Sequence, residues 1–192
     1  FATSTSPAMM QAIYGTPLQW VVMLAPIGLV FFLAAKVQSM RASTAQTLFW
    51  VYAGSMGLSL AYVFAVYTGE SVARVFFITA GAFAGLSLYG YTTKRNLSGM
   101  GSFLIMGVIG LLIAAVVNMF LESSALQFAI SVLGVLIFAG LTAYDTQKIK
   151  SIYVESDGTA VAEKKAIMGA LTLYLDFINM FIFLLHLFGN RE

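Results

Sequence analysis

Two aspartates are the residues of this sequence with the clearest potential for chemistry, because both belong to long apolar stretches. Asp176 lies about ten residues into the stretch 166–188, roughly 15 Å along a helix. Asp145 lies near the end of the preceding apolar stretch, with Lys148 at the spacing of a helical ion pair. Neighbouring carboxylates share one proton more readily than both ionise, and ionised carboxylates are hard oxygen ligands for Ca²⁺. We therefore expect Asp145 and Asp176 to form a pH-sensing pair that can contact Ca²⁺.

The segment that carries Asp176 has one polar face. On a helix, Gly169, Thr172, Asp176 and Asn179 recur at steps of three and four residues and share that face. The other faces are Leu, Ile, Phe and Met. An intramembrane carboxylate faces the interior of a helix bundle, so we expect the rest of the chain to wrap around this segment, with Thr172 and Asn179 supporting Asp176.

The composition indicates one integral membrane domain over residues 1–192. The chain is 60% hydrophobic and 9% charged, whereas soluble domains carry roughly 25% charged residues. It has no cysteine and one histidine, which excludes disulfides, cysteine metal sites and multi-histidine sites. The net charge of +2, spread over short loops, does not indicate nucleic-acid binding. We expect no cofactor.

Six apolar segments are long enough to cross a bilayer as helices, which takes about 20 residues. Short connections join them, except for the charged stretch 148–165, which holds Glu155, Asp157 and Glu163 and which we expect to be a solvated loop. The predicted fold is therefore all-α. The six predicted spans are about Leu18–Ala35, Thr44–Tyr67, Ala73–Tyr91, Phe103–Leu121, Ala125–Thr146 and Ala166–Phe188.

The loop charges predict an orientation. Basic loops alternate with loops that hold only Glu70 and Glu122, and cytoplasmic loops collect Lys and Arg. The C-terminus is then expected on the outer side, and so is the start of the first predicted span. A further helix before residue 1 would restore a cytoplasmic N-terminus, giving seven spans. The bases of the basic loops are Lys36, Arg41, Lys94, Arg95, Lys148, Lys150, Lys164 and Lys165.

Small residues four apart, as at Gly81 and Gly85 or at Gly110 and Ala114, predict positions where helices pack closely in lipid. We expect these positions to be structural.

Enzyme chemistry is poorly supported by the sequence. An intramembrane serine protease needs a serine and a histidine at one depth, but Ser59 and Ser87 are in mid-span whereas His186 is near a span end. The two aspartates leave an intramembrane aspartyl protease open. We expect a protein that is not an enzyme.

Four stretches of the chain resemble the Bax inhibitor-1, or transmembrane Bax inhibitor motif, family. The two specific ones contain the aspartates, at 140–150 (GLTAYDTQKIK) and 169–181 (GALTLYLDFINMF), and residues 87–98 and 57–60 support them. The resemblance, closest to the bacterial inner-membrane branch, implies seven helices with the last one central. Residues 1 and 2 would then be the tail of the first helix.

The resemblance also implies a pH-sensitive Ca²⁺ leak. The family's paired aspartates match Asp145 and Asp176 and form a proton-sensitive gate, in which a hydrogen-bonded pair gives way to an open pore. Some relatives have a basic residue that latches one aspartate, and the nearest bases here are Lys36 and Arg41.

Three functions remain open from the sequence. The first is the leak channel, a protein in the lipid bilayer that interacts with Ca²⁺ and with protons. The second is a membrane-embedded interaction protein that modulates a membrane protease or a stress response, because some bacterial relatives are associated with a membrane-bound AAA protease. The third is a proton-coupled cation exchanger. Flux through the purified protein alone separates the first from the second, and flux driven by an opposing gradient indicates the third.

Overall fold

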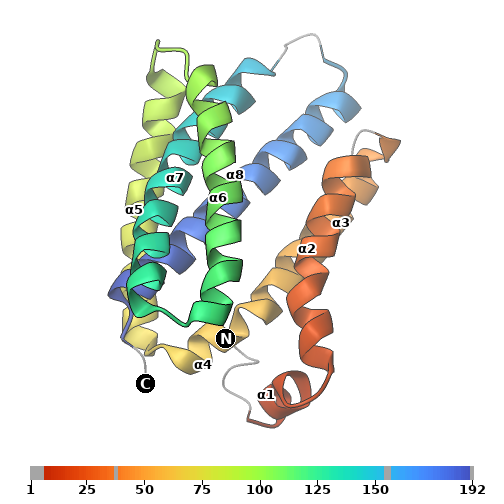
Figure 1. Ribbon diagram of the computed structural model, residues 1–192. Coiled ribbons are helices and arrows are strands. Elements are labelled where there is room, and N and C mark those ends of the chain that lie inside the picture. Colours follow the sequence, from red (N-terminus) through yellow and green to blue (C-terminus); the bar gives the residue numbers. More distant parts are fainter. Residues whose placement is uncertain (1–6, 37–38, 154–156, 191–192) are drawn as a thin grey trace. The chain divides into compact units, whose positions relative to one another are not determined.

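The computed structural model describes residues 7–36, 39–153 and 157–190, and the elements drawn in Figure 1 are helices. This confirms the predicted all-α class. A short helix, α1, precedes the first predicted span and was not expected from the sequence. The helices are α1 (Pro7–Tyr14), α2 (Leu18–Lys36), α3 (Ala42–Ser59), α4 (Ala61–Val66), α5 (Gly69–Thr92), α6 (Ser98–Leu121), α7 (Ser124–Ser151) and α8 (Thr159–Phe188).

Five helical segments among the described residues are long and apolar enough to cross a membrane. They are Ala42–Val66, in which α3 and α4 are consecutive, and the helices α5, α6, α7 and α8. The predicted count of six or seven spans is therefore not confirmed, because α2, which matches the first predicted span, is not among the five.

The stretch predicted as a solvated loop, 148–165, is largely helical. Helix α7 continues to Ser151, and α8 already begins at Thr159. Its Ala, Lys and Glu residues have high helix propensity, so both helices extend past their apolar parts. Near the start of α8, the Lys165 ammonium and the Asp157 carboxylate form an ion pair 2.5 Å long.

The chain divides into two compact units. The first contains α1 to α4 and the beginning of α8, through Met168. Within it, the hydroxyl of Ser59 on α3 donates a hydrogen bond to the Val22 carbonyl on α2, 2.5 Å away. The second unit contains α5, α6, α7 and the remainder of α8, from Gly169 to Asn190.

Close packing in the second unit occurs at other glycines than the sequence predicts. A side chain at Gly90 of α5 would overlap the backbone of Ala143 on α7, so these two helices approach closely there. A side chain at Gly81, Gly85 or Gly110 would meet open space among the described residues. These three predicted positions therefore have no close neighbour among the described residues, because the spacing of small residues does not reveal which helix face meets a neighbour.

Helix α8 is the most buried of the five candidate spans. In its most apolar window, 39% of the residues are buried, against 11–33% in the others. The ring of Phe177 contacts Phe76 and Phe83 on α5, with centroids 5.6 and 5.5 Å apart, and Phe183 stacks on Phe138 of α7 at 5.9 Å. Within its unit, α8 thus packs against both α5 and α7. Its enclosure by all the other helices stays a prediction.

The end of α8 is fastened to the start of α5. The guanidinium of Arg74 donates to the Phe188 carbonyl at 3.2 Å, and the amide of Asn190 donates to the buried Ser71 hydroxyl at 2.9 Å. A positive charge at a helix C-terminus is favourable because it complements the helix dipole.

The turn between α6 and α7 is closed by Asn118. Its side-chain oxygen accepts from the Ser123 amide at 3.1 Å, and its side-chain nitrogen donates to Gln127, also at 3.1 Å. Between the helices, Glu122 adopts a left-handed backbone conformation with φ of 48°. Asn118 therefore has a structural role at a helix end.

Candidate functional site

Asp176 lies on α8 in the interior of the second unit. It is 4% exposed, and one of its carboxyl oxygens, Oδ2, has no hydrogen-bond partner among the described residues. The next residue, Phe177, packs its ring against α5. The polar face of α8 is therefore buried where the helix spacing predicts, with a carboxyl group that is only partly satisfied.

Asp145 of α7 is brought to Asp176. Helices α7 and α8 run antiparallel within the second unit, as the approach of Gly169 to Ile149 and of Gly134 to Phe183 shows. The half-buried Asp145 and the buried Asp176 lie close enough for their carboxyl groups to interact electrostatically. A hydrogen bond between two carboxyl groups requires one proton between them. The structure thus unites the two aspartates that the sequence singles out.

Asp145 and Asp176 form a contact between two candidate spans, and the charge on their carboxyl groups changes the energy of that contact. Two ionised carboxylates about 4 Å apart repel by roughly 4 kcal/mol at an effective dielectric constant of about 20. With one proton shared, that repulsion is replaced by a hydrogen bond. Asp145 is also attracted by Lys148, whereas Asp176 has only the other carboxyl group as an electrostatic neighbour among the described residues. The interaction between α7 and α8 at this level is therefore sensitive to the charge of these two carboxyl groups.

Two predicted supporting residues flank Asp176 on α8. Asn179 is half-buried and donates its side-chain amide to the Leu175 carbonyl at 2.8 Å, within its own helix. Thr172 is half-buried one turn before Asp176. Both lie on the predicted side of the helix, and their part in the function stays a prediction.

The two basic residues of the predicted site lie in different units. Lys148 is exposed at the end of α7, and its ammonium lies 5.9 Å from the centre of the Tyr144 ring. Arg41 directly precedes α3 in the first unit, with an exposed side chain. The role of Arg41 as a latch stays a prediction.

Asp145 and Asp176 together offer few ligands for a metal ion. No cluster of three or more His, Cys, Asp or Glu side chains occurs in the described part of the chain. Ca²⁺ takes six to eight oxygen ligands when it is held in a protein site. Asp145 and Asp176 alone supply fewer carboxylate oxygens than such a site takes, and their contact with Ca²⁺ stays a prediction.

A further polar group was missed as a candidate for the interior. The hydroxyl of Ser87 on α5 is buried without a hydrogen-bond partner among the described residues. The sequence signal for this group is a serine in mid-span, at a position where a hydroxyl can face the interior of the bundle. Ser59, the other serine of the serine-protease hypothesis, donates to backbone carbonyls, and His186 is exposed near the end of α8.

The sequence is similar to known proteins of one family. The family model described as "Inhibitor of apoptosis-promoting Bax1" matches residues 1–192. The uncharacterised Rickettsia prowazekii protein RP147 is 51% identical, covering 96% of this chain and 76% of its own. The Escherichia coli inner membrane protein YbhL is 48% identical, covering 88% of this chain and 73% of its own. The chain therefore belongs to the Bax inhibitor family of integral membrane proteins.

Proposed function

We propose that this protein is a passive, pH-sensitive Ca²⁺ leak channel whose gate is the pair Asp145 and Asp176. The observation that carries the proposal is the proximity of two carboxyl groups from different candidate spans. Asp176 is buried with one oxygen unpartnered among the described residues, and Asp145 is half-buried. Bulk pH changes the occupancy of the shared proton, and ionised oxygens attract a divalent cation. Pore opening is the separation of α8 from α7 at this level.

The character of the contacts around α8 supports this choice of moving element. Towards α5, α8 packs through aromatic rings, and its last turn is tied to Arg74 and Ser71. Towards α7, at the level of Asp176, the contact is between two carboxyl groups. A change in pH therefore acts on the interface between α7 and α8 at the level of Asp176. It leaves in place the aromatic contacts of α8 with α5 and the stacked rings of Phe138 and Phe183, which join α7 and α8 further along α8.

A reversible crosslink between α7 and α8 tests the proposal. The sequence has no cysteine, so Ile149→Cys and Gly169→Cys would be its only thiols. A Cβ at Gly169 lies 3.1 Å from Cγ2 of Ile149, which places the two Cβ atoms close to disulfide range, about 3.5–4.5 Å. Oxidation should abolish Ca²⁺ flux into proteoliposomes, and reduction should restore it.

The matched control joins α7 to a helix that does not move in the proposal. Gly107→Cys and Ile137→Cys link α6 to α7, where a Cβ at Gly107 lies 2.8 Å from the Ile137 side chain. Oxidation of this pair should leave flux unchanged. Equal flux with the α7–α8 crosslink formed and reduced would refute the proposed opening.

One observation favours a second function, a membrane-embedded interaction protein that modulates a membrane protease or a stress response. No group of three or more His, Cys, Asp or Glu side chains occurs among the described residues, so Asp145 and Asp176 form a pair of the size that a structural contact between two helices needs. This function predicts no flux through the purified protein and recovery of a membrane protease with it from cells.

We also propose that the protein resides in the bacterial inner membrane with its C-terminus outside. The name of its relative YbhL and the alternation of basic loops support this. Alkaline phosphatase fused after residue 192 should be active, whereas a fluorescent protein fused there should be dark. The opposite result would reverse the orientation.

A further inference from the structure

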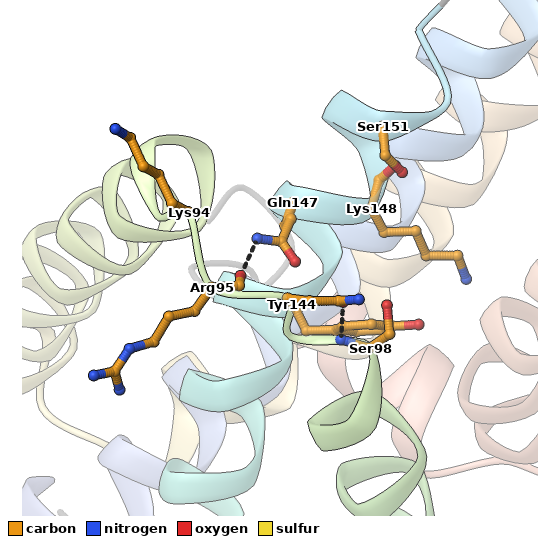
Figure 2. Close-up of a pocket in the computed structure, with 8 residues that line it drawn as sticks. Lys94, Arg95, Ser98, Tyr144, Gln147, Lys148 and Ser151 are labelled. Atoms are coloured by element: carbon orange, nitrogen blue, oxygen red, sulfur yellow. Dashed lines mark hydrogen bonds between the residues drawn. The ribbon is translucent and has the colours of Figure 1, made fainter.

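A polar pocket of about 380 Å³ lies in the second unit, where α5 and α7 end and α6 begins (Figure 2). Three of its lining residues are basic, namely Lys94, Arg95 and Lys148, and none of the lining residues is acidic. The side chains of all three are exposed. In Figure 2, Lys94 and Arg95 extend on one side of Gln147, and Lys148 extends on the other. The pocket is therefore a recess with three cationic side chains at its rim, whose charged ends extend outward in Figure 2.

Hydrogen bonds hold the pocket in shape. The Gln147 side chain accepts from the Leu97 amide at 2.9 Å and donates to the Arg95 carbonyl at 2.8 Å, which fastens the loop between α5 and α6 to α7. Asn96 accepts from the Ser98 amide at 2.9 Å at the start of α6. The recess is thus formed by ordered polar groups before any ligand arrives.

The pocket borders a surface suited to hydrocarbon chains. The first turns of α6 expose Met100, Phe103 and Met106, which are 37%, 69% and 62% exposed. Helix α6 is one of the five candidate spans. An apolar surface therefore begins beside the basic recess, as at the boundary between the headgroups and the acyl chains of a bilayer.

We propose that this pocket binds a phosphate group, presented by the headgroup of an anionic phospholipid. Basic pockets between spans bind anionic headgroups because Lys and Arg are attracted to the charged leaflet. Lys94, Arg95 and Lys148 supply the charge, Ser98 and Tyr144 line the recess with hydroxyl groups, and the apolar row on α6 receives the acyl chains. A soluble phosphate shares the headgroup's chemistry but not the contact with α6.

Lipid binding to the purified full chain tests the proposal. Native mass spectrometry would compare phosphatidylglycerol with phosphatidylcholine of the same acyl chains, and inorganic phosphate would be added as a competitor. Lys94→Gln and Arg95→Gln are the pocket variants. Lys150→Gln is the matched control, because Lys150 is exposed at the same end of α7 but is absent from the pocket lining and bonds to the Tyr91 carbonyl.

We expect the wild-type protein to prefer phosphatidylglycerol and each pocket variant to bind it about fivefold more weakly, the effect of one basic residue near anionic lipid. Lys150→Gln should change binding less than twofold. Displacement by inorganic phosphate without any preference for phosphatidylglycerol would support the site with a soluble phosphate as its ligand. Equal loss in all three variants, or neither lipid preference nor phosphate binding, would overturn the proposal.

Discussion

The energetic coupling between Asp145 and Asp176 can be measured with a double-mutant cycle. The variants are Asp145→Ala, Asp176→Ala and the double substitution, and the readout is the free energy of unfolding in mixed micelles. Removing one member of a bonded pair leaves the other without its partner, which costs about 1–3 kcal/mol for a buried polar group. Removing both side chains leaves no unpaired carboxyl group. The double variant should therefore lose less free energy of unfolding than the two single variants lose together.

The structure also predicts which single substitution costs more. Asp145→Ala leaves Asp176, which is 4% exposed and would lose the neighbouring carboxyl group with which it can share a proton. Asp176→Ala leaves Asp145, which is half-buried and still attracted by Lys148. We therefore expect Asp145→Ala to approach the upper end of the range of about 1–3 kcal/mol and Asp176→Ala the lower end.

Asp176→Asn is the control. Its side-chain amide can still donate a hydrogen bond to Asp145, so this substitution should lower the free energy of unfolding less than Asp176→Ala does. The coupling energy should be about 1–3 kcal/mol, typical of residues in direct contact. Additive losses, within about 0.5 kcal/mol, would refute the contact.

Two further predictions concern packing and turn closure. Gly90→Leu should destabilise the protein by about 1–3 kcal/mol because its side chain would overlap the Ala143 backbone. Gly85→Leu, on the same helix but facing open space among the described residues, should be nearly neutral, and equal losses in the unfolding assay would contradict the packing. Asn118→Ala should cost about 1–2 kcal/mol because it removes the side-chain bonds that close the turn between α6 and α7. Unchanged stability would show that this turn does not need them.

The meeting of the aspartates could be predicted because it follows from topology. Consecutive spans joined by a short connection run antiparallel, so Asp145 near the end of one and Asp176 within the next fall at similar depth. Helical spacing then places Asp176 on the polar face of α8. Both inferences need only the helix period and the span boundaries, which apolar stretches define well.

Other features depend on which helix faces meet, and the sequence does not encode this locally. Gly85 and Gly90 lie on the same helix, yet only Gly90 faces a neighbouring backbone. Gln147 shapes the basic pocket by reaching a loop about fifty residues earlier in the chain, a contact without any periodic signal. The helical extension of α7 and α8 into the polar stretch 148–165 was missed because apolarity, rather than helix propensity, defined the predicted ends.

The pH dependence of Ca²⁺ flux tests the gate most directly. Proteoliposomes containing the purified full-length protein would be assayed from about pH 6 to pH 8, the range that brackets physiological pH, with Asp145→Asn and Asp176→Asn in parallel. We expect wild-type flux that varies with pH and a flattened response in either variant, because each substitution removes a group that shares the proton. Absence of flux above empty liposomes, or a pH response that survives both substitutions, would contradict an aspartate-gated channel.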